Sequence, residues 1–245
     1  MRNILVKIEY FGENYVGWQK QQNGMSVEQA VCDAAKQLLG HEIKLYGSGR
    51  TDSGVHALGQ TANFYTDSSV PTGKITGGLN AYLPEDIRVV SAEEMPMKFH
   101  ARFDAVAKEY VYVIYNRSIM NPVYRGRAAH VFYPLDIDKM QRAAEDLLGE
   151  HDFAGFMGSG SSVKNTVREI YDVGFETEGD LVKFHIKGNG FLYNMVRIII
   201  ATLIDIGRGR YGEDRIKMIL GEKERSMANV TAPPEGLYLK EVFYD

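Results

Sequence analysis

A glycine-rich stretch, Gly47 to Gln60 (GSGRTDSGVHALGQ), constrains the fold of this chain more than any other segment. Glycine has no Cβ, so such a stretch can turn tightly and can bring backbone close to a ligand. Residues 42–46 before it alternate polar and apolar, and residues 60–65 after it are also strand-like. The pattern predicts two strands joined by a stiff loop that carries Asp52, and loops on rigid scaffolds often carry function.

The predicted loop is compatible with several kinds of site. Its glycine spacing does not match a phosphate-binding fingerprint, because Asp52 stands where the third glycine belongs and no Gly-Lys-Ser/Thr follows. Asp52 and His56 could bind a metal, but no Cys or second His lies at ligand spacing. Asp52 kept ionised by Arg50 could serve as a nucleophile or base. It could also simply bond its own backbone in an Asx-type turn, which composition alone favours.

Five segments, spread in order over nearly the whole chain, carry a recognisable set of motifs. They are Glu9 to Gln21 (EYFGENYVGWQKQ), Arg50 to Ala57 (RTDSGVHA), Lys108 to Asn116 (KEYVYVIYN), Gly188 to Arg197 (GNGFLYNMVR) and Thr231 to Leu239 (TAPPEGLYL). Together they resemble the opening, catalytic, central-strand, third and closing motifs of the TruA-type tRNA pseudouridine synthases. No position to which we assign a function departs from the family pattern.

The resemblance implies an enzyme that isomerises uridine to pseudouridine at positions 38, 39 and 40 of tRNA, near the anticodon. The reaction breaks the N1–C1′ bond, turns the uracil, joins C5 to C1′ and releases the C5 proton. We expect no cofactor and no metal, because one shielded carboxylate suffices as the nucleophile or base. That group would be Asp52, acting at C1′, at C6 or on the C2′ proton. The resemblance also implies a homodimer.

The resemblance assigns four further residues to the substrate site. Arg50 would fill the space left by the flipped nucleotide. Tyr110 would stack under the uracil, although a plain strand-core aromatic is the alternative. Arg197 would pair with Asp52, since a charge on an otherwise apolar helix needs a partner. Leu237 would contact the target base, although a lone leucine is usually a core residue.

Four other residues are expected to have structural roles. We expect His56 to be a hydrogen-bonding residue rather than an acid or base. Trp18, the only tryptophan, is expected to anchor the core rather than stack on a base. Tyr112 and Tyr115 are expected to be core aromatics of their strand.

Composition is typical of a soluble globular protein, at 44% hydrophobic and 24% charged residues. No apolar run approaches the roughly 20 residues of a membrane helix, and no secretory signal is recognisable. The single cysteine, Cys32, fits a reducing cytoplasm. The net charge of −4 counts mildly against RNA binding, but phosphates respond to local patches. Candidates for such a patch are Arg50, Arg102, Lys108, Arg125, Arg127, Lys164, Arg168, Lys187, Arg197, Arg208 and Arg210.

Periodicity and turn signals predict an α+β fold made of two similar β-α-β-type halves, residues 1–105 and 106–245. Helices are expected from Ser26 to Gly40 and over 72–82, 136–148, 191–206 and 213–220, and strands over 3–10, 87–92, 104–115, 167–176, 181–187 and at the C-terminus. A small polar segment, 155–162, is expected to be a mobile loop. The halves would form a mixed, mainly antiparallel sheet, with helices on one side and a central RNA-binding cleft on the other.

Two alternatives come from other functional classes. A non-catalytic RNA-binding protein could use the same scaffold, but the presence of Asp52, Arg50 and Arg197 argues against it. A nucleoside hydrolase or glycosidase usually needs two carboxylates at a set separation, or a metal. The motifs contain a single candidate carboxylate, so an isomerase is favoured.

Overall fold

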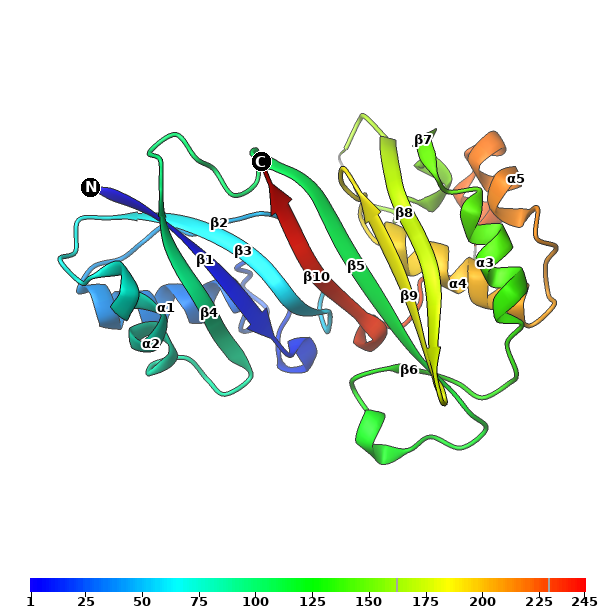
Figure 1. The fold of residues 1–245 in the computed structure, drawn as a ribbon, viewed down its shortest axis with the longest axis horizontal. Coiled ribbons are helices and arrows are strands. Elements are labelled where there is room, and N and C mark those ends of the chain that lie inside the picture. Colours follow the sequence, from blue (N-terminus) through cyan, green and yellow to red (C-terminus); the bar gives the residue numbers. More distant parts are fainter. Residues whose placement is uncertain (162, 229) are drawn as a thin grey trace. The chain divides into compact units, whose positions relative to one another are not determined.

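The computed structural model describes residues 1–161, 163–228 and 230–245 and contains two compact units (Figure 1). The first unit comprises Met1–Val106 and Tyr238–Asp245, and the second comprises Ala107–Leu237. Each unit combines a mainly antiparallel sheet with helices, so the predicted α+β class is confirmed. The last strand of the chain therefore belongs to the same unit as the N-terminal residues.

The first unit is built around a mixed sheet. Its strands are β1 (Arg2–Tyr10), β2 (Tyr46–Gly47), β3 (His56–Thr66), β4 (Ile87–Met95) and β10 (Leu237–Tyr244), and its helices are α1 (Val27–Leu39) and α2 (Thr72–Asn80). The order is β4-β1-β3-β10, with β2 also on β3. Strand β1 pairs antiparallel with both neighbours, whereas β10 runs parallel to β3. The central position of β1 explains its row of fully buried residues, Ile4, Val6 and Ile8.

Helix α1 begins and ends where its sequence predicts. The Ser26 hydroxyl accepts a hydrogen bond from the Gln29 backbone N–H at 3.1 Å, which satisfies one of the unpaired amides of the first turn. Gly40 ends the helix in the left-handed region with φ of 80°. These two signals are local, so they can be read without knowledge of the tertiary structure.

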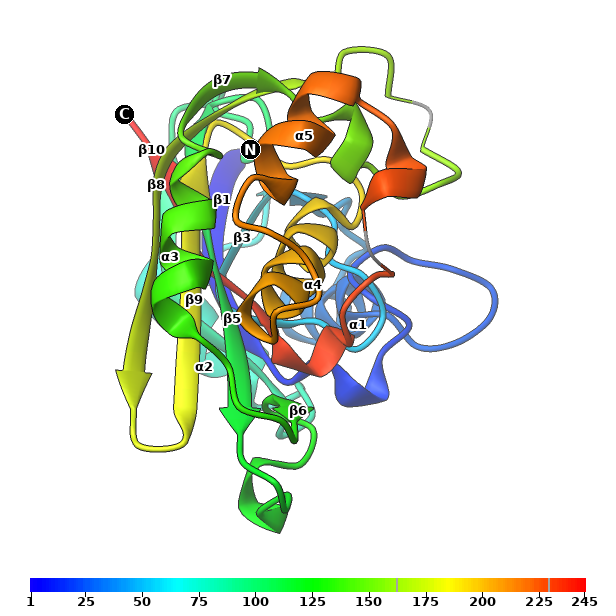
Figure 2. The same cartoon turned by 90° about the vertical axis from the view of Figure 1, so that its right-hand side faces the viewer.

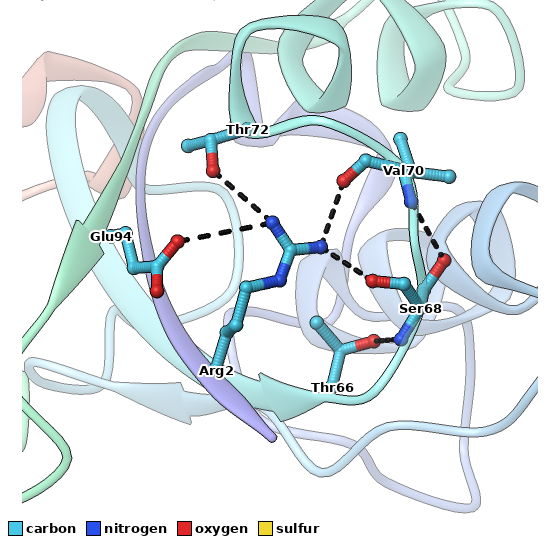
Figure 3. Close-up of polar contacts among 6 residues, drawn as sticks. All are labelled: Arg2, Thr66, Ser68, Val70, Thr72 and Glu94. Carbon is cyan, nitrogen blue, oxygen red and sulfur yellow. Dashed lines mark hydrogen bonds and ion pairs between the residues drawn. The ribbon is translucent and has the colours of Figure 1, made fainter.

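The arginine at the start of β1 ties three parts of the first unit together (Figure 3). The Arg2 guanidinium donates to the carbonyls of Ser68 at 2.6 Å and Val70 at 2.8 Å, and to the Thr72 hydroxyl at 3.3 Å. Glu94 of β4 lies 3.9 Å from the same guanidinium. One side chain thus fixes the connection between β3 and α2 against the edge of the sheet.

The second unit contributes strands in the order β5-β9-β8-β7, with β6 parallel to β5. Its strands are β5 (Ala105–Asn116), β6 (Ala129–Val131), β7 (Gly149–Asp152), β8 (Val167–Glu178) and β9 (Leu181–Gly188), and its helices are α3 (Ile137–Glu145), α4 (Met195–Gly207) and α5 (Arg215–Glu222). Helices α4 and α5 lie on the same side of strands β5, β8 and β9 (Figure 2). Within α4 every residue except Arg197 is buried, as expected for a helix that is apolar all round.

Two predicted elements differ from the structure. Residues 42–45 are not a strand, and β2 contains only Tyr46–Gly47. Leu45 is buried nonetheless. The alternation of polar and apolar residues therefore reflects a side chain in the core, although the backbone forms no strand there. The long apolar helix begins at Met195 rather than at Phe191, because Asn194 adopts a left-handed φ of 58°. Leu192 is buried in the turn before it, which extended the apolar pattern beyond the helix.

The remaining elements agree with the prediction to within a few residues, and the short strands β6 and β7 were not predicted. Gly179, with φ of 60°, forms the turn between β8 and β9 at the predicted position. Ser162, the last residue of the predicted loop 155–162, lies outside the described residues. In the described part of the chain, no helix combines the length and the apolar character needed to cross a membrane.

Candidate active site

Asp52 lies half-buried in the loop between β2 and β3, with Arg50 exposed on the same loop. The start of this loop is fixed to β3 by a buried polar network. The Ser48 N–H donates to the Thr61 carbonyl at 2.8 Å, and the Ser48 hydroxyl donates to Gln60 Oε1 at 2.7 Å. Gln60 Nε2 in turn donates to the Gly49 carbonyl at 3.1 Å. The backbone that leads to Arg50 is therefore held by a strand and not left to solvent.

The residues on either side of Asp52 are held by a second loop, residues 10–18. The Trp18 N–H donates to the Thr51 carbonyl at 3.1 Å, and the Tyr10 and Thr51 hydroxyls are 2.7 Å apart. On the other side, the Ser53 hydroxyl donates to the Tyr15 carbonyl at 3.1 Å. Both neighbours of Asp52 thus have fixed positions, which restricts where its carboxylate can lie.

The contact between the two loops requires glycine at position 17. Gly17 has φ of +108°, and a Cβ there would lie 2.7 Å from the Thr51 carbonyl oxygen and 3.2 Å from the Ser53 nitrogen. Any larger residue would combine backbone strain with a clash against the backbone on both sides of Asp52. The packing of Gly17 against residues 51–53 therefore explains why the opening motif has a glycine at this position.

Three aromatic side chains, Tyr10, Trp18 and His56, lie buried beneath the two loops. Burial raises the pKa of Tyr10 above its ordinary value, which is already well above neutral, and its hydroxyl shares a hydrogen bond with Thr51. Trp18 is buried, as predicted, and its indole leaves room for only a glycine at position 47. His56 makes the structural hydrogen bond expected of it: Nδ1 accepts from the Gly12 N–H at 2.9 Å.

Tyr110 is presented by the second unit on strand β5, opposite Ile186 of β9. Its ring is half-buried and meets the Phe191 ring edge to face, with centroids 5.1 Å apart and an interplanar angle of 84°. Such a contact orients an aromatic ring without a hydrogen bond. Tyr112 and Tyr115 of the same strand are buried, which confirms their prediction as core residues.

Arg197 is fixed in the first turn of α4. Its Nε donates to the Ala232 carbonyl at 2.8 Å and its Nη1 donates to Asn194 Oδ1 at 3.0 Å. The Ala232 N–H donates back to the Arg197 carbonyl at 3.2 Å. The left-handed Asn194 that delays the start of α4 therefore also supplies a partner for the arginine.

The segment 231–236, which we call the strap, is attached to β5 as well as to α4. The Tyr112 hydroxyl donates to the Pro233 carbonyl at 2.8 Å. A Cβ at Gly236 would lie 2.5 Å from the Tyr112 ring, so the strap approaches β5 as closely as backbone can. Leu237 follows directly and is buried, at 6% exposure. The closing motif is thus held by residues of the central-strand and third motifs.

The structure places the predicted residues in two sets, one in each unit. Arg50 and Asp52 share one loop in the first unit, and Tyr110 and Arg197 lie on a strand and a helix of the second, with Leu237 at the end of its strap. Sequence reasoning did not identify Tyr10, Gly17 or Thr51 as residues that hold the loop, although all lie within the quoted motifs. No group of three or more His, Cys, Asp or Glu suited to a metal occurs among the described residues.

A family model described as tRNA pseudouridine synthase matches residues 7–104 and 143–245. The chain belongs to this family. It is 50% identical to tRNA pseudouridine synthase A of Acetivibrio thermocellus and 46% identical to that of Thermoanaerobacter pseudethanolicus, in both cases over 100% of each chain. The crystal structure of an archaeal box H/ACA sRNP Nop10–Cbf5 complex matches with a TM-score of 0.39 and 14% identity, over 95% of this chain and 46% of that one.

This synthase is therefore an isomerase that forms pseudouridine in tRNA, and the resemblance found in its motifs is confirmed. The two alternatives, a binding protein without activity and a glycosidase, are not supported by these relatives.

Proposed function

We propose that this synthase modifies uridines 38, 39 and 40 in the anticodon stem-loop of tRNA, with Asp52 as its nucleophile or base. The observation that carries the role of Asp52 is the immobilisation of Thr51 and Ser53 on either side of a half-buried carboxylate. A reacting group held in one place loses little freedom on reaching the transition state. An Asx turn alone would need no second loop to support it.

Arg50 is proposed to occupy the space left when the target uridine leaves the helical stack. Its side chain is exposed, although the backbone next to it is fixed by Gln60 through the Gly49 carbonyl. A planar guanidinium can stack on the neighbouring bases and keep its charge near the phosphates. A fixed backbone and an exposed guanidinium at Arg50 suit this role.

Three residues of the second unit complete the proposal. Tyr110 would stack under the uracil while the ring turns, because stacking tolerates rotation about the base normal. Arg197 would pair with the Asp52 carboxylate through guanidinium nitrogens other than the Nε that binds Ala232. Leu237 would give the uracil an apolar contact.

The synthase is further proposed to act as a cytoplasmic homodimer. The support is the family resemblance for the dimer and the single cysteine for a reducing compartment. Sedimentation equilibrium of the purified protein tests the dimer, and a monomer at micromolar concentration would contradict it.

Replacement of Asp52 tests the central assignment. Asp52→Asn keeps the shape and removes the charge, so single-turnover conversion is expected to fall at least about 10³-fold while tRNA affinity is retained. Pseudouridine is mapped at positions 38, 39 and 40 of tRNA incubated with each variant. Asp33→Asn, an exposed carboxylate on α1 bonded to Gln29, is the control. Conversion by Asp52→Asn within tenfold of wild type would remove Asp52 from the mechanism, and pseudouridine only at other positions would remove the anticodon assignment.

Replacement of Tyr110 separates two roles of its ring. Tyr110→Leu removes both stacking and the hydroxyl and is expected to be inactive. Tyr110→Phe keeps the contact with Phe191 and removes only the hydroxyl; we expect it to be clearly impaired, because the hydroxyl contributes to removal of the C5 proton. Single-turnover assays should then show accumulation of an intermediate joined at C1′–C5. A Phe variant with wild-type rates would leave stacking as the only role.

A further inference from the structure

Arg168, the second residue of β8, is a half-buried arginine whose charge lacks an ion-pair partner among the described residues. Its Nη1 donates to the backbone carbonyls of Asn165 at 3.0 Å and Val167 at 2.5 Å. Burial lowers the pKa of the guanidinium, and no neighbouring carboxylate offsets this effect within the described chain. A charge partly removed from water gains most from an anion that arrives with a ligand.

Three other arginines of the second unit are held by carboxylates. Arg142 makes a bidentate pair with Glu213, Arg117 pairs with Asp180, and Arg208 pairs with the buried Asp205. Those pairs give each of these guanidinium groups a carboxylate. At Arg168, one nitrogen is held by carbonyl oxygens, while Nε and Nη2 make no hydrogen bond within the described chain. This leaves an oriented pair of donors with the spacing that a phosphate accepts.

The sheet register places Arg168 on the same face as Tyr110. Ile170 of β8 and Lys108 of β5 both pair with Gly188, and Tyr110 pairs with Ile186. Directly paired residues share a face, and side chains alternate along each strand. Residues 168, 170, 186 and 110 therefore point to the same side. With about 3.4 Å per residue and about 4.8 Å between strands, Arg168 and Tyr110 lie roughly 15–20 Å apart.

The segment between the two side chains links them physically. A Cβ at Gly190 would be 3.7 Å from Arg168 Nε, and the next residue, Phe191, packs its ring against Tyr110. Asn189, just before, is bonded to Glu169 through both its backbone N–H and its side chain, at 3.0 and 3.1 Å. The third motif thus connects the arginine and the tyrosine along one face of the sheet.

We propose that Arg168 binds a backbone phosphate of the substrate tRNA, on the same face as Tyr110 but outside the target nucleotide. The inference rests on the proposed stacking of the uracil on Tyr110 and adds a phosphate subsite to it. The guanidinium fork donates from Nε and Nη2 to two phosphate oxygens. Such a contact fixes the position of the RNA and does not take part in bond making.

Salt dependence of binding tests the subsite without reference to catalysis. Affinity is measured in the Asp52→Asn background, so that the uridine stays unmodified. Arg168→Gln is expected to weaken binding about tenfold at low salt and to reduce the slope of log K against log salt by about 0.7–0.9, the value for one phosphate. Arg117→Gln, which removes an exposed and ion-paired arginine of the same unit, is expected to leave the slope unchanged.

Neutral phosphate analogues identify the contact. In a series of anticodon stem-loops that each carry one methylphosphonate, a single position is expected to weaken wild-type binding by the same factor as Arg168→Gln. That position should have no effect on the Arg168→Gln variant. A folded Arg168→Gln protein with wild-type slope and profile would overturn the subsite. A flat slope for the wild type would instead contradict binding of tRNA through its phosphates as a whole.

Arg168→Lys covers the case in which the Gln variant does not fold. It keeps the charge and loses the fork, so we expect weaker binding by about threefold with an unchanged salt slope. Wild-type affinity in this variant would overturn the bidentate contact. Thermal unfolding of each variant shows which comparison applies.

Discussion

The two units present their site residues by different physical means. In the first unit, Asp52 and Arg50 lie on a loop, and a second loop with hydrogen bonds and a glycine contact determines where that loop lies. In the second unit, Tyr110 and Arg197 lie on a strand and a helix, and only the strap is irregular. A loop position depends on a few specific contacts, whereas a strand or helix position is fixed by many repeated ones.

This difference determines which small substitutions are expected to lower activity in each unit. Tyr10 and Gly17, which hold the Asp52 loop through Thr51, lie 42 and 35 positions before Asp52 in the chain. None of these three contributes a charge to the site. We therefore expect the first unit to be sensitive to changes that alter packing alone, and the second to changes that alter specific donors.

Gly17→Ala should produce the largest effect on the comparison. A Cβ with φ of +108° and 2.7 Å from the Thr51 carbonyl adds backbone strain of about 1–3 kcal/mol and displaces the Asp52 loop. A displacement of about 1 Å can cost about 10²-fold in rate, so we expect a loss of that size in single-turnover conversion. Gly73→Ala in α2, where nothing lies within 4 Å of the new Cβ, is the control and should keep full activity. Equal activity of the two variants would show that the inter-loop contact is not needed.

Arg197→Lys should have an intermediate effect. Lysine keeps the charge but cannot donate to Ala232 and Asn194 simultaneously in the geometry of the guanidinium. We expect a loss of about 1–2 kcal/mol in the free energy of unfolding and a fall of about tenfold or more in single-turnover rate. Arg117→Lys, at an exposed position of the same unit where the arginine pairs with Asp180, serves as the matched control. Denaturant unfolding and rate assays that show no change would mean that charge alone suffices at position 197.

Thr51→Val should have the smallest effect on the rate of conversion, because its effect is on stability, and it sharpens the comparison by a double-mutant cycle. It leaves the buried Tyr10 hydroxyl without its 2.7 Å partner, at a cost of about 1–3 kcal/mol in stability. Thr51→Ser keeps the hydroxyl and is expected to stay close to wild type. Combining Thr51→Val with Tyr10→Phe removes both polar groups and should recover part of the loss. Strictly additive losses would show that the two hydroxyls do not act as a pair.

Much of the fold could be predicted because its signals are local. Ser26 and Gly40 mark the ends of α1, and Gly179 marks a hairpin turn. The apolar pattern of α4 predicts a buried helix. The wrong boundaries of the predicted strand and helix arose where a buried residue does not belong to a strand or helix. Leu45 and Leu192 are buried without belonging to the predicted strand and helix, because a side chain can reach the core from a turn or loop.

The sequence by itself determined the family, the motif residues and the chemistry they suggest, because side-chain type and spacing along the chain carry that information. Tertiary structure alone decided what holds those residues. Contacts between segments that are distant in sequence hold them: Gly17 packs against Thr51, Tyr10 shares a hydrogen bond with Thr51, and Arg197 donates to Ala232. The same holds for the last strand, which pairs with β3 although the whole second unit lies between them in sequence. Such contacts depend on the path of the backbone in space, and no local pattern of residues encodes it.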